Sequence, residues 1–265
     1  MPPRPYYSAF MLLSLAVFVI ARQLLPKTPG LSRLTWRQRT ALGLAAFIGG
    51  ALGAKLPFID TDAGWLTGIW FRDGKTLTTG LIGGYLGVEL AKLALDIRLK
   101  TGDSFALPLA LALAVGRWGC FCNHCCFGRE TCLPWGVDFG DGVCRHPTQI
   151  YESLFHLVMA VFLWQLWRRG MWGEQRLKAY LIAYCVFRFG CEFIRPEAAW
   201  AAGLTFYQVV VALFAAALVC QWAWDGQRSC RFHRGVAEVA RLQGASPGTL
   251  ASSATGSSRC KRDML

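Results

Sequence analysis

The sequence predicts an all-α integral membrane protein with about seven transmembrane helices. Three observations support this prediction. Of the 265 residues, 54% are hydrophobic and only 17% are charged, whereas a soluble globular domain carries about 25% charged residues. The apolar residues form long stretches, and basic residues are concentrated in every second loop between them. This combination is typical of a multi-pass membrane protein.

Each apolar stretch approaches the roughly 20 residues that a helix needs to cross a bilayer. In chain order we expect helices at 7–24, 41–58, 76–95, 104–122, 148–167, 178–194 and 204–224. The first stretch could instead be a cleaved signal. A retained helix is favoured, because no small-x-small site follows it and its trailing flank is strongly basic. Glycines in the third stretch predict close helix packing.

The loops predict the orientation. Basic residues follow the first, third, fifth and seventh stretches, at Arg22, Lys27, Arg33, Arg37, Arg39, Arg98, Lys100, Arg168, Arg169, Arg176, Lys178, Arg228, Arg231 and Arg234. Basic loops remain in the cytoplasm, so we expect the N-terminus outside and the C-terminus inside. The net charge of +12 is therefore attributed to these loops, and no nucleic-acid partner is expected. Residues 1–225 are predicted to form the membrane domain and 226–265 a basic, disordered cytoplasmic tail.

Charged residues inside these stretches need partners, because a charge at the bilayer centre costs at least about 2.5–3.5 kcal/mol. Arg117 lies near the outer end of the fourth stretch. Tyr184, Arg188 and Glu192 share one face of the sixth helix. Arg188 and Glu192 could form only an internal salt bridge, or the carboxylate could hold the arginine toward an anionic substrate.

The segment RHPTQIYE, 145–152, supplies a third polar group at the start of the fifth helix. Gln149, Glu152 and His156 fall on roughly one face, and Glu152 requires a partner, for which we expect an arginine. A structural clasp is the alternative. Together these groups predict a cationic cavity open to the outer face, suited to an anionic phospholipid head group.

Four motifs resemble the bacterial prolipoprotein diacylglyceryl transferases, over about residues 76–197. The stretch GRWGCFCNHCCFG, 116–128, is similar to the family's G-R-x-G-N-F-x-N-x-E-x-x-G. GRETCLPWGVDF resembles G-R-x-T-x-L-P-W-G, and RHPTQIYE resembles R-H-P-S-Q-L-Y-E. LIAYCVFRFGCEFIRPE resembles L-I-G-Y-x-x-F-R-x-x-x-E-F-x-R.

The resemblance implies a bacterial cytoplasmic (inner) membrane enzyme. It would move the diacylglyceryl group of phosphatidylglycerol to the lipobox cysteine thiol of a preprolipoprotein, beside membrane lipid and without a cofactor or metal. The implied catalytic residues are Arg117, Arg188 and Glu192, and His146 and Glu152 are added as candidate catalytic residues from the same motifs. The implied substrate-binding residues are Arg117, Asn123, Gly128, Arg129, Tyr184 and Tyr151.

Three positions depart from the family pattern. Thr78 stands where the family has histidine, Cys120 where it has asparagine, and Cys125 where it has glutamate. Threonine cannot act as a base near neutral pH, so His124, His146 and Glu152 remain alternative bases. The clustered cysteines could be plain or disulfide-bonded, bind a metal, or supply a reactive thiol. A paralogue with another acceptor or chemistry, or a thiol-rich metal or redox protein, is the alternative function.

Overall fold

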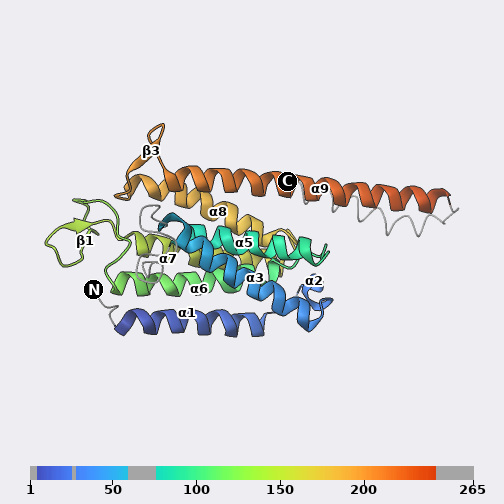
Figure 1. Cartoon of the computed structure of the whole chain (residues 1–265), viewed down its shortest axis with the longest axis horizontal. Coiled ribbons are helices and arrows are strands. Elements are labelled where there is room, and N and C mark those ends of the chain that lie inside the picture. The colour runs from blue at the N-terminus through green and yellow to red at the C-terminus, as the bar shows by residue number, and fades with distance from the viewer. Residues whose placement is uncertain (1–4, 26–27, 59–75, 243–265) are drawn as a thin grey trace. The chain divides into compact units, whose positions relative to one another are not determined.

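The computed structural model describes residues 5–25, 28–58 and 76–242 (Figure 1). The chain divides into two compact units. One spans Arg22–Ser104, and the other combines the N-terminal segment up to Ala21 with the chain from Phe105 onward.

The unit Arg22–Ser104 is built on two closely packed helices. It contains α2 (Pro29–Ser32), α3 (Trp36–Lys55), the short 3-10 helix η1 (Leu56–Phe58) and α5 (Leu77–Ala94). Thr35 begins α3 with a capping box, in which its side chain accepts from the N–H of Gln38 and its own N–H donates to the Gln38 side chain. Such a reciprocal cap satisfies donors that a helix start otherwise leaves unpaired.

Glycines allow α3 and α5 to touch along their backbones. A Cβ added at Gly83 would collide with the carbonyl oxygen of Gly49, and one added at Gly53 would collide with that of Thr79. The glycine face expected for the third helix is therefore a helix-packing face. Thr78 lies buried near the start of α5 in this unit.

The larger unit holds the remaining long helices. They are α1 (Pro5–Leu24), α6 (Asp103–Cys122), α7 (Thr148–Arg168), α8 (Arg176–Cys191) and α9 (Phe206–Leu242), and the 3-10 helix η2 (Glu192–Ile194) continues α8. Strands β1 (Val137–Asp138) and β2 (Cys144–Arg145) pair antiparallel between α6 and α7. Strands β3 (Ala199–Ala201) and β4 (Leu204–Thr205) pair antiparallel before α9.

Two contacts illustrate how these helices are held together. Ser14 of α1 donates a 2.6 Å hydrogen bond to the carbonyl oxygen of Ala112 in α6. A Cβ at Gly119 would lie 2.9 Å from Met11 Cε and 3.0 Å from Phe10 Cβ, so this glycine admits α1 against α6. Helices α8 and α9 run side by side (Figure 1), and an ion pair joins Lys178 to Asp225.

Helix α7 is polar inside and apolar outside. Gln149, Glu152 and His156 are buried, whereas Leu154 and Val158 are about three-fifths exposed, at 60% and 59%. That arrangement would be unfavourable in water but suits a lipid-facing helix whose polar groups point into the protein. The face expected for Gln149, Glu152 and His156 is therefore confirmed.

All seven expected stretches are helical over most of their length. Among the described residues, four helices are long and apolar enough to cross a membrane, at Tyr6–Leu24, Asp103–Cys122, Thr148–Arg168 and Phe206–Gln227. The all-α membrane class is confirmed. Helix α9 continues to Leu242, so the first part of the tail expected to be disordered over 226–265 is helical, and its remainder lies outside the described residues.

Candidate functional site

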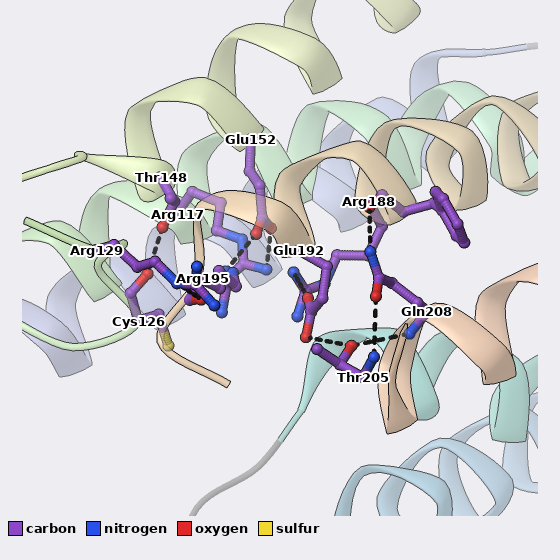
Figure 2. A network of polar contacts seen from close by, with 11 residues as sticks. Arg117, Cys126, Arg129, Thr148, Glu152, Arg188, Glu192, Arg195, Thr205 and Gln208 are labelled. Atoms are coloured by element: carbon purple, nitrogen blue, oxygen red, sulfur yellow. Dashed lines mark hydrogen bonds and ion pairs between the residues drawn. The ribbon is translucent and has the colours of Figure 1, made fainter. Parts of the chain in front are cut away.

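A buried carboxylate shared by two arginines forms the centre of the site (Figure 2). Glu152 of α7 is fully buried. Arg117 of α6 forms an ion pair with its Oε2, and Arg195, directly after η2, donates a 2.7 Å hydrogen bond to its Oε1. The sequence therefore correctly indicated an arginine partner for Glu152, and the structure supplies two.

A second ion pair lies beside the first. Nη1 of Arg188 is 2.5 Å from Oε2 of Glu192, and both side chains are buried. Thr205 Oγ1 donates to Glu192 Oε1 over 3.2 Å, and the guanidinium of Arg188 lies 5.6 Å from the ring centroid of Tyr207. The expected pairing of Arg188 with Glu192 is confirmed, and contacts with residues 205 and 207 hold it in place.

The two groups together carry an excess of positive charge. The ion pairs contain three arginines and two glutamates, so the group carries one net positive charge. The arginines are Arg117, Arg188 and Arg195, and the glutamates are Glu152 and Glu192. Within the part of the chain that the structure describes, the buried Nε–H groups of Arg117 and Arg195 have no hydrogen-bond acceptor. A buried donor without an acceptor costs about 1–3 kcal/mol, and more when it is charged. The site is therefore suited to an anion.

The aromatic residues expected at the site fall into two places. His146 Nδ1 lies 3.2 Å from the hydroxyl of Tyr151, which accepts a 2.9 Å hydrogen bond from Trp135 Nε1. Deeper in the protein, the Tyr184 ring is stacked 5.4 Å from the His156 ring, and His156 Nδ1 is 2.8 Å from the Tyr180 hydroxyl. Tyr151 thus lies in the first turn of α7, whereas Tyr184 of α8 packs against His156, farther along α7.

The segment Gly128–Arg129 joins the loop after α6 to the end of η2. The N–H of Gly128 donates to the His146 carbonyl over 2.8 Å, and that of Arg129 donates to the Ile194 carbonyl over 2.7 Å. Arg129 Nε also donates to the Arg195 carbonyl over 2.7 Å. A Cβ at Gly128 would lie 2.7 Å from the Ile194 oxygen, so close packing requires glycine here. Arg129, although exposed, thereby positions the backbone that carries Arg195.

Three thiols converge at the end of α6. The Sγ atoms of Cys120, Cys125 and Cys126 all lie within 4.8 Å of one another. Arg117 Nη1 is 3.9 Å from Cys120 Sγ. Hydrogen bonds from the Cys120 and Cys125 thiols hold the pKa of Cys126 below its usual range, and the charges of Arg117 and Arg195 add to this effect.

Other expected site residues have simpler positions. Asn123 follows α6 directly, and its N–H donates to the Gly119 carbonyl over 3.0 Å. His124 Nδ1 lies 2.5 Å from the carbonyl oxygen of Phe139, the residue directly after β1, and this contact attaches His124 to the β1–β2 connection.

Sequence reasoning did not include Arg195 among the site residues. It lies one position beyond the last expected residue of the sixth helix, outside any apolar stretch. The signal that could have revealed it is the arginine that ends the motif F-R-x-x-x-E-F-x-R, which matches Arg195 in this chain. Thr205 and Gln208, which support the second ion pair and the carbonyl of Phe189, carried no comparable signal.

Comparisons with known proteins identify relatives of this chain. A family described as "Prolipoprotein diacylglyceryl transferase" matches residues 5–224. A phosphatidylglycerol–prolipoprotein diacylglyceryl transferase of Chlorobaculum tepidum is 34% identical over 254 residues, which cover 84% of this chain and 85% of the relative. A second enzyme of that name from Clostridium perfringens is 32% identical over 182 residues, covering 63% of this chain and 70% of the relative.

A third relative, from Streptomyces coelicolor, is 34% identical over 190 residues, covering 67% of this chain. The chain spans little more than half of that relative, 56% of its length. The match to the family nevertheless extends over most of the helices described above, including all three arginines of the site. The chain belongs to the prolipoprotein diacylglyceryl transferase family.

Proposed function

We propose that this protein transfers the diacylglyceryl group of phosphatidylglycerol to the lipobox cysteine thiol of a preprolipoprotein. The relatives carry the name of this activity. The observation that carries the proposal is the excess positive charge of the Arg117, Arg188 and Arg195 group, together with the buried Nε–H groups of Arg117 and Arg195. A phosphodiester supplies the negative charge and oxygen acceptors that this group requires.

The proposed reaction is a displacement at carbon. The lipobox sulfur forms a C–S bond to the glyceryl carbon as the C–O bond to phosphate breaks, and glycerol phosphate leaves with the electron pair. Negative charge develops on the departing phosphate, where fixed cations stabilise the transition state. Arg117 and Arg188 are assigned this task, with Glu152 and Glu192 holding them in position.

The thiol must lose its proton to become nucleophilic. Both oxygens of Glu152 are engaged by guanidinium groups, which makes it a holder of Arg117 and Arg195 rather than a free base. His146 is only partly buried, and an imidazole is the side chain most often used to accept a proton in catalysis. We therefore assign proton acceptance to His146, with Tyr151 orienting its ring.

The proposal includes the placement of the chain in the bacterial cytoplasmic membrane. Seven helices cross it, with the N-terminus outside, the C-terminus and the basic tail from 226 in the cytoplasm, and residues 1–225 forming the membrane domain. Cys132 and Cys144 are exposed in the loop between α6 and α7. In a variant whose other cysteines are replaced, Cys132 and Cys144 should react with a membrane-impermeant maleimide in intact spheroplasts. If they react only after the membrane is broken, the proposed orientation is wrong.

The decisive experiment is a transfer assay with the purified full-length chain. Phosphatidylglycerol with labelled acyl chains and a lipobox peptide should yield labelled peptide, and a peptide with serine in place of the lipobox cysteine should remain unlabelled. Complementation of a strain depleted of its own transferase provides the cellular test. No labelling of the cysteine peptide by protein that is folded and inserted in lipid would refute the activity.

A further inference from the structure

The feature that the proposed transfer does not use is the group of three thiols at the end of α6. Cys120 lies in the last turn of that helix, and Cys125 and Cys126 lie in the loop that follows. The chain turns back so that all three Sγ atoms come within 4.8 Å of one another. Cys132 and Cys144, which are exposed farther along the same connection between α6 and α7, are not part of this group.

From this convergence we propose that Cys120, Cys125 and Cys126 form a binding site for one thiophilic d10 metal ion, such as Zn(II) or Cu(I). Soft thiolate ligands select ions of this class. A metal–sulfur bond is about 2.3 Å long, so two thiolates on one ion stand about 3.7–4.0 Å apart. The separations in the structure are therefore compatible with three bonds to one ion after small side-chain movements.

Contacts outside the three cysteines fix the backbone of the loop that carries Cys125 and Cys126. His124 and Cys126 both have positive φ angles, 53° and 64°, and such conformations are unfavourable for residues other than glycine unless other contacts hold them. These contacts come from α7. Gln149 Nε2 donates to the Cys125 carbonyl over 2.6 Å, and Thr148 Oγ1 donates to the Cys126 carbonyl over 2.5 Å.

Charge also favours a thiolate site at this position. Nη1 of Arg117 lies 3.9 Å from Cys120 Sγ, so a guanidinium stands beside the sulfurs and compensates part of the negative charge that three thiolates would bring to the site. A second chemistry, oxidation of two of these thiols to a disulfide, competes for the same sulfurs in an oxidising compartment. Metal binding requires the reduced thiols, whereas a disulfide removes two of them, so the two chemistries are distinguished by the redox state of the cysteines.

The test uses the full-length protein in detergent, reduced with a phosphine and kept free of oxygen. Zn(II) and Cu(I) are titrated separately in competition with a chromophoric chelator for each ion. We expect one ion per chain, with a thiolate-to-metal absorption band for Cu(I). Cys125→Ser should weaken binding by roughly 100-fold or more, because loss of a direct ligand exceeds the 10- to 100-fold effect of outer-shell changes.

Matched variants give the control. The double variant Cys132→Ser, Cys144→Ser removes two thiols of the same loop and should bind as the wild type does. The triple variant at 120, 125 and 126 should bind neither ion. Equal binding by the triple variant, no binding by the reduced wild type, or loss of binding in the double variant would each overturn the proposal.

A second measurement does not depend on the folding of any variant. In the wild type, bound metal should protect Cys120, Cys125 and Cys126 from alkylation, while Cys132 and Cys144 react at their usual rate. Alkylation of the three thiols unchanged by metal would overturn the proposal, as would a disulfide among them in freshly isolated membranes. No lipid substrate is present, so these results stand apart from those of the transfer assay.

Discussion

The carboxylate of Glu152 in α7 accepts a 2.7 Å hydrogen bond from Nη2 of Arg195, which lies 43 positions farther along the chain. The same carboxylate forms an ion pair with Arg117 of α6. One buried acidic group thus joins α6, α7 and the segment after η2. The stability of this region and the positions of two arginines of the proposed anion site therefore depend on the same side chain.

Replacing the charge of Glu152 should destabilise the protein. Glu152→Gln keeps the shape but leaves Arg117 and Arg195 without their carboxylate, and removing one partner of a buried ion pair costs about 3–5 kcal/mol. Unfolding in detergent, followed by circular dichroism over temperature or denaturant, measures the change. Glu130→Gln provides the control, because Glu130 is exposed in the connection between α6 and α7, where its ion pair with Arg145 contributes about 0–1 kcal/mol. If the two variants lost the same free energy of unfolding, the structural role of Glu152 would be contradicted.

Replacing Arg117 should impair lipid transfer more strongly than it impairs the stability of the fold. Arg117→Lys keeps a positive charge for Glu152 but loses the planar guanidinium and its Nε–H, so we expect a decrease in kcat/KM of about 10²-fold or more. The labelled-lipid assay measures it, with unfolding temperature recorded in parallel. Arg98→Lys is the matched control, since Arg98 is exposed and pairs with the equally exposed Asp96. If Arg117→Lys leaves kcat/KM unchanged, Arg117 has no part in the proposed mechanism.

The contact between α3 and α5 provides a prediction about packing. In Gly83→Ala the new Cβ would collide with the Gly49 carbonyl oxygen, which cannot move aside as a flexible side chain would. We expect a loss of about 1–3 kcal/mol in the free energy of unfolding. Gly43→Ala, in α3 but with nothing within 4 Å of the added Cβ, should be neutral or stabilising by up to about 1 kcal/mol. If both substitutions have the same effect, the backbone contact is not the cause.

The loop between β1 and β2 should depend on pH. The Asp138 carboxylate accepts N–H groups from Gly140, Asp141 and Gly142 over 2.8, 3.1 and 3.0 Å, and these bonds lower its pKa. Because the folded pKa is depressed, this contribution is fully present above the unfolded value of about 3.9 and is lost as pH falls through the folded value.

Hydrogen exchange provides the measurement. Protection factors of the Gly140 and Gly142 amides, corrected for intrinsic exchange, should fall on acidification below the ordinary aspartate pKa. In Asp138→Ala, protection should be low at every pH. Protection that is the same in wild type and variant across the pH range would show that the carboxylate does not organise the loop.

The sequence alone was sufficient for the helices and for the local ion pair. Apolar stretches specify helices through their length, and the i, i+4 spacing places Arg188 beside Glu192 whatever surrounds them. It also indicated that the polar face of α7 points into the protein, because only an interior partner compensates a charge such as that of Glu152.

Tertiary structure decided which distant groups meet. Arg195 reaches Glu152 because η2 turns the chain after α8, and no periodicity of the sequence encodes that approach. Cys120, Cys125 and Cys126 gather, while Cys132 and Cys144 do not, because positive φ angles and hydrogen bonds from Thr148 and Gln149 shape the loop. Helical periodicity is a local property that sequence displays directly, whereas the closing of a loop depends on the free energy of contacts between residues far apart in the chain.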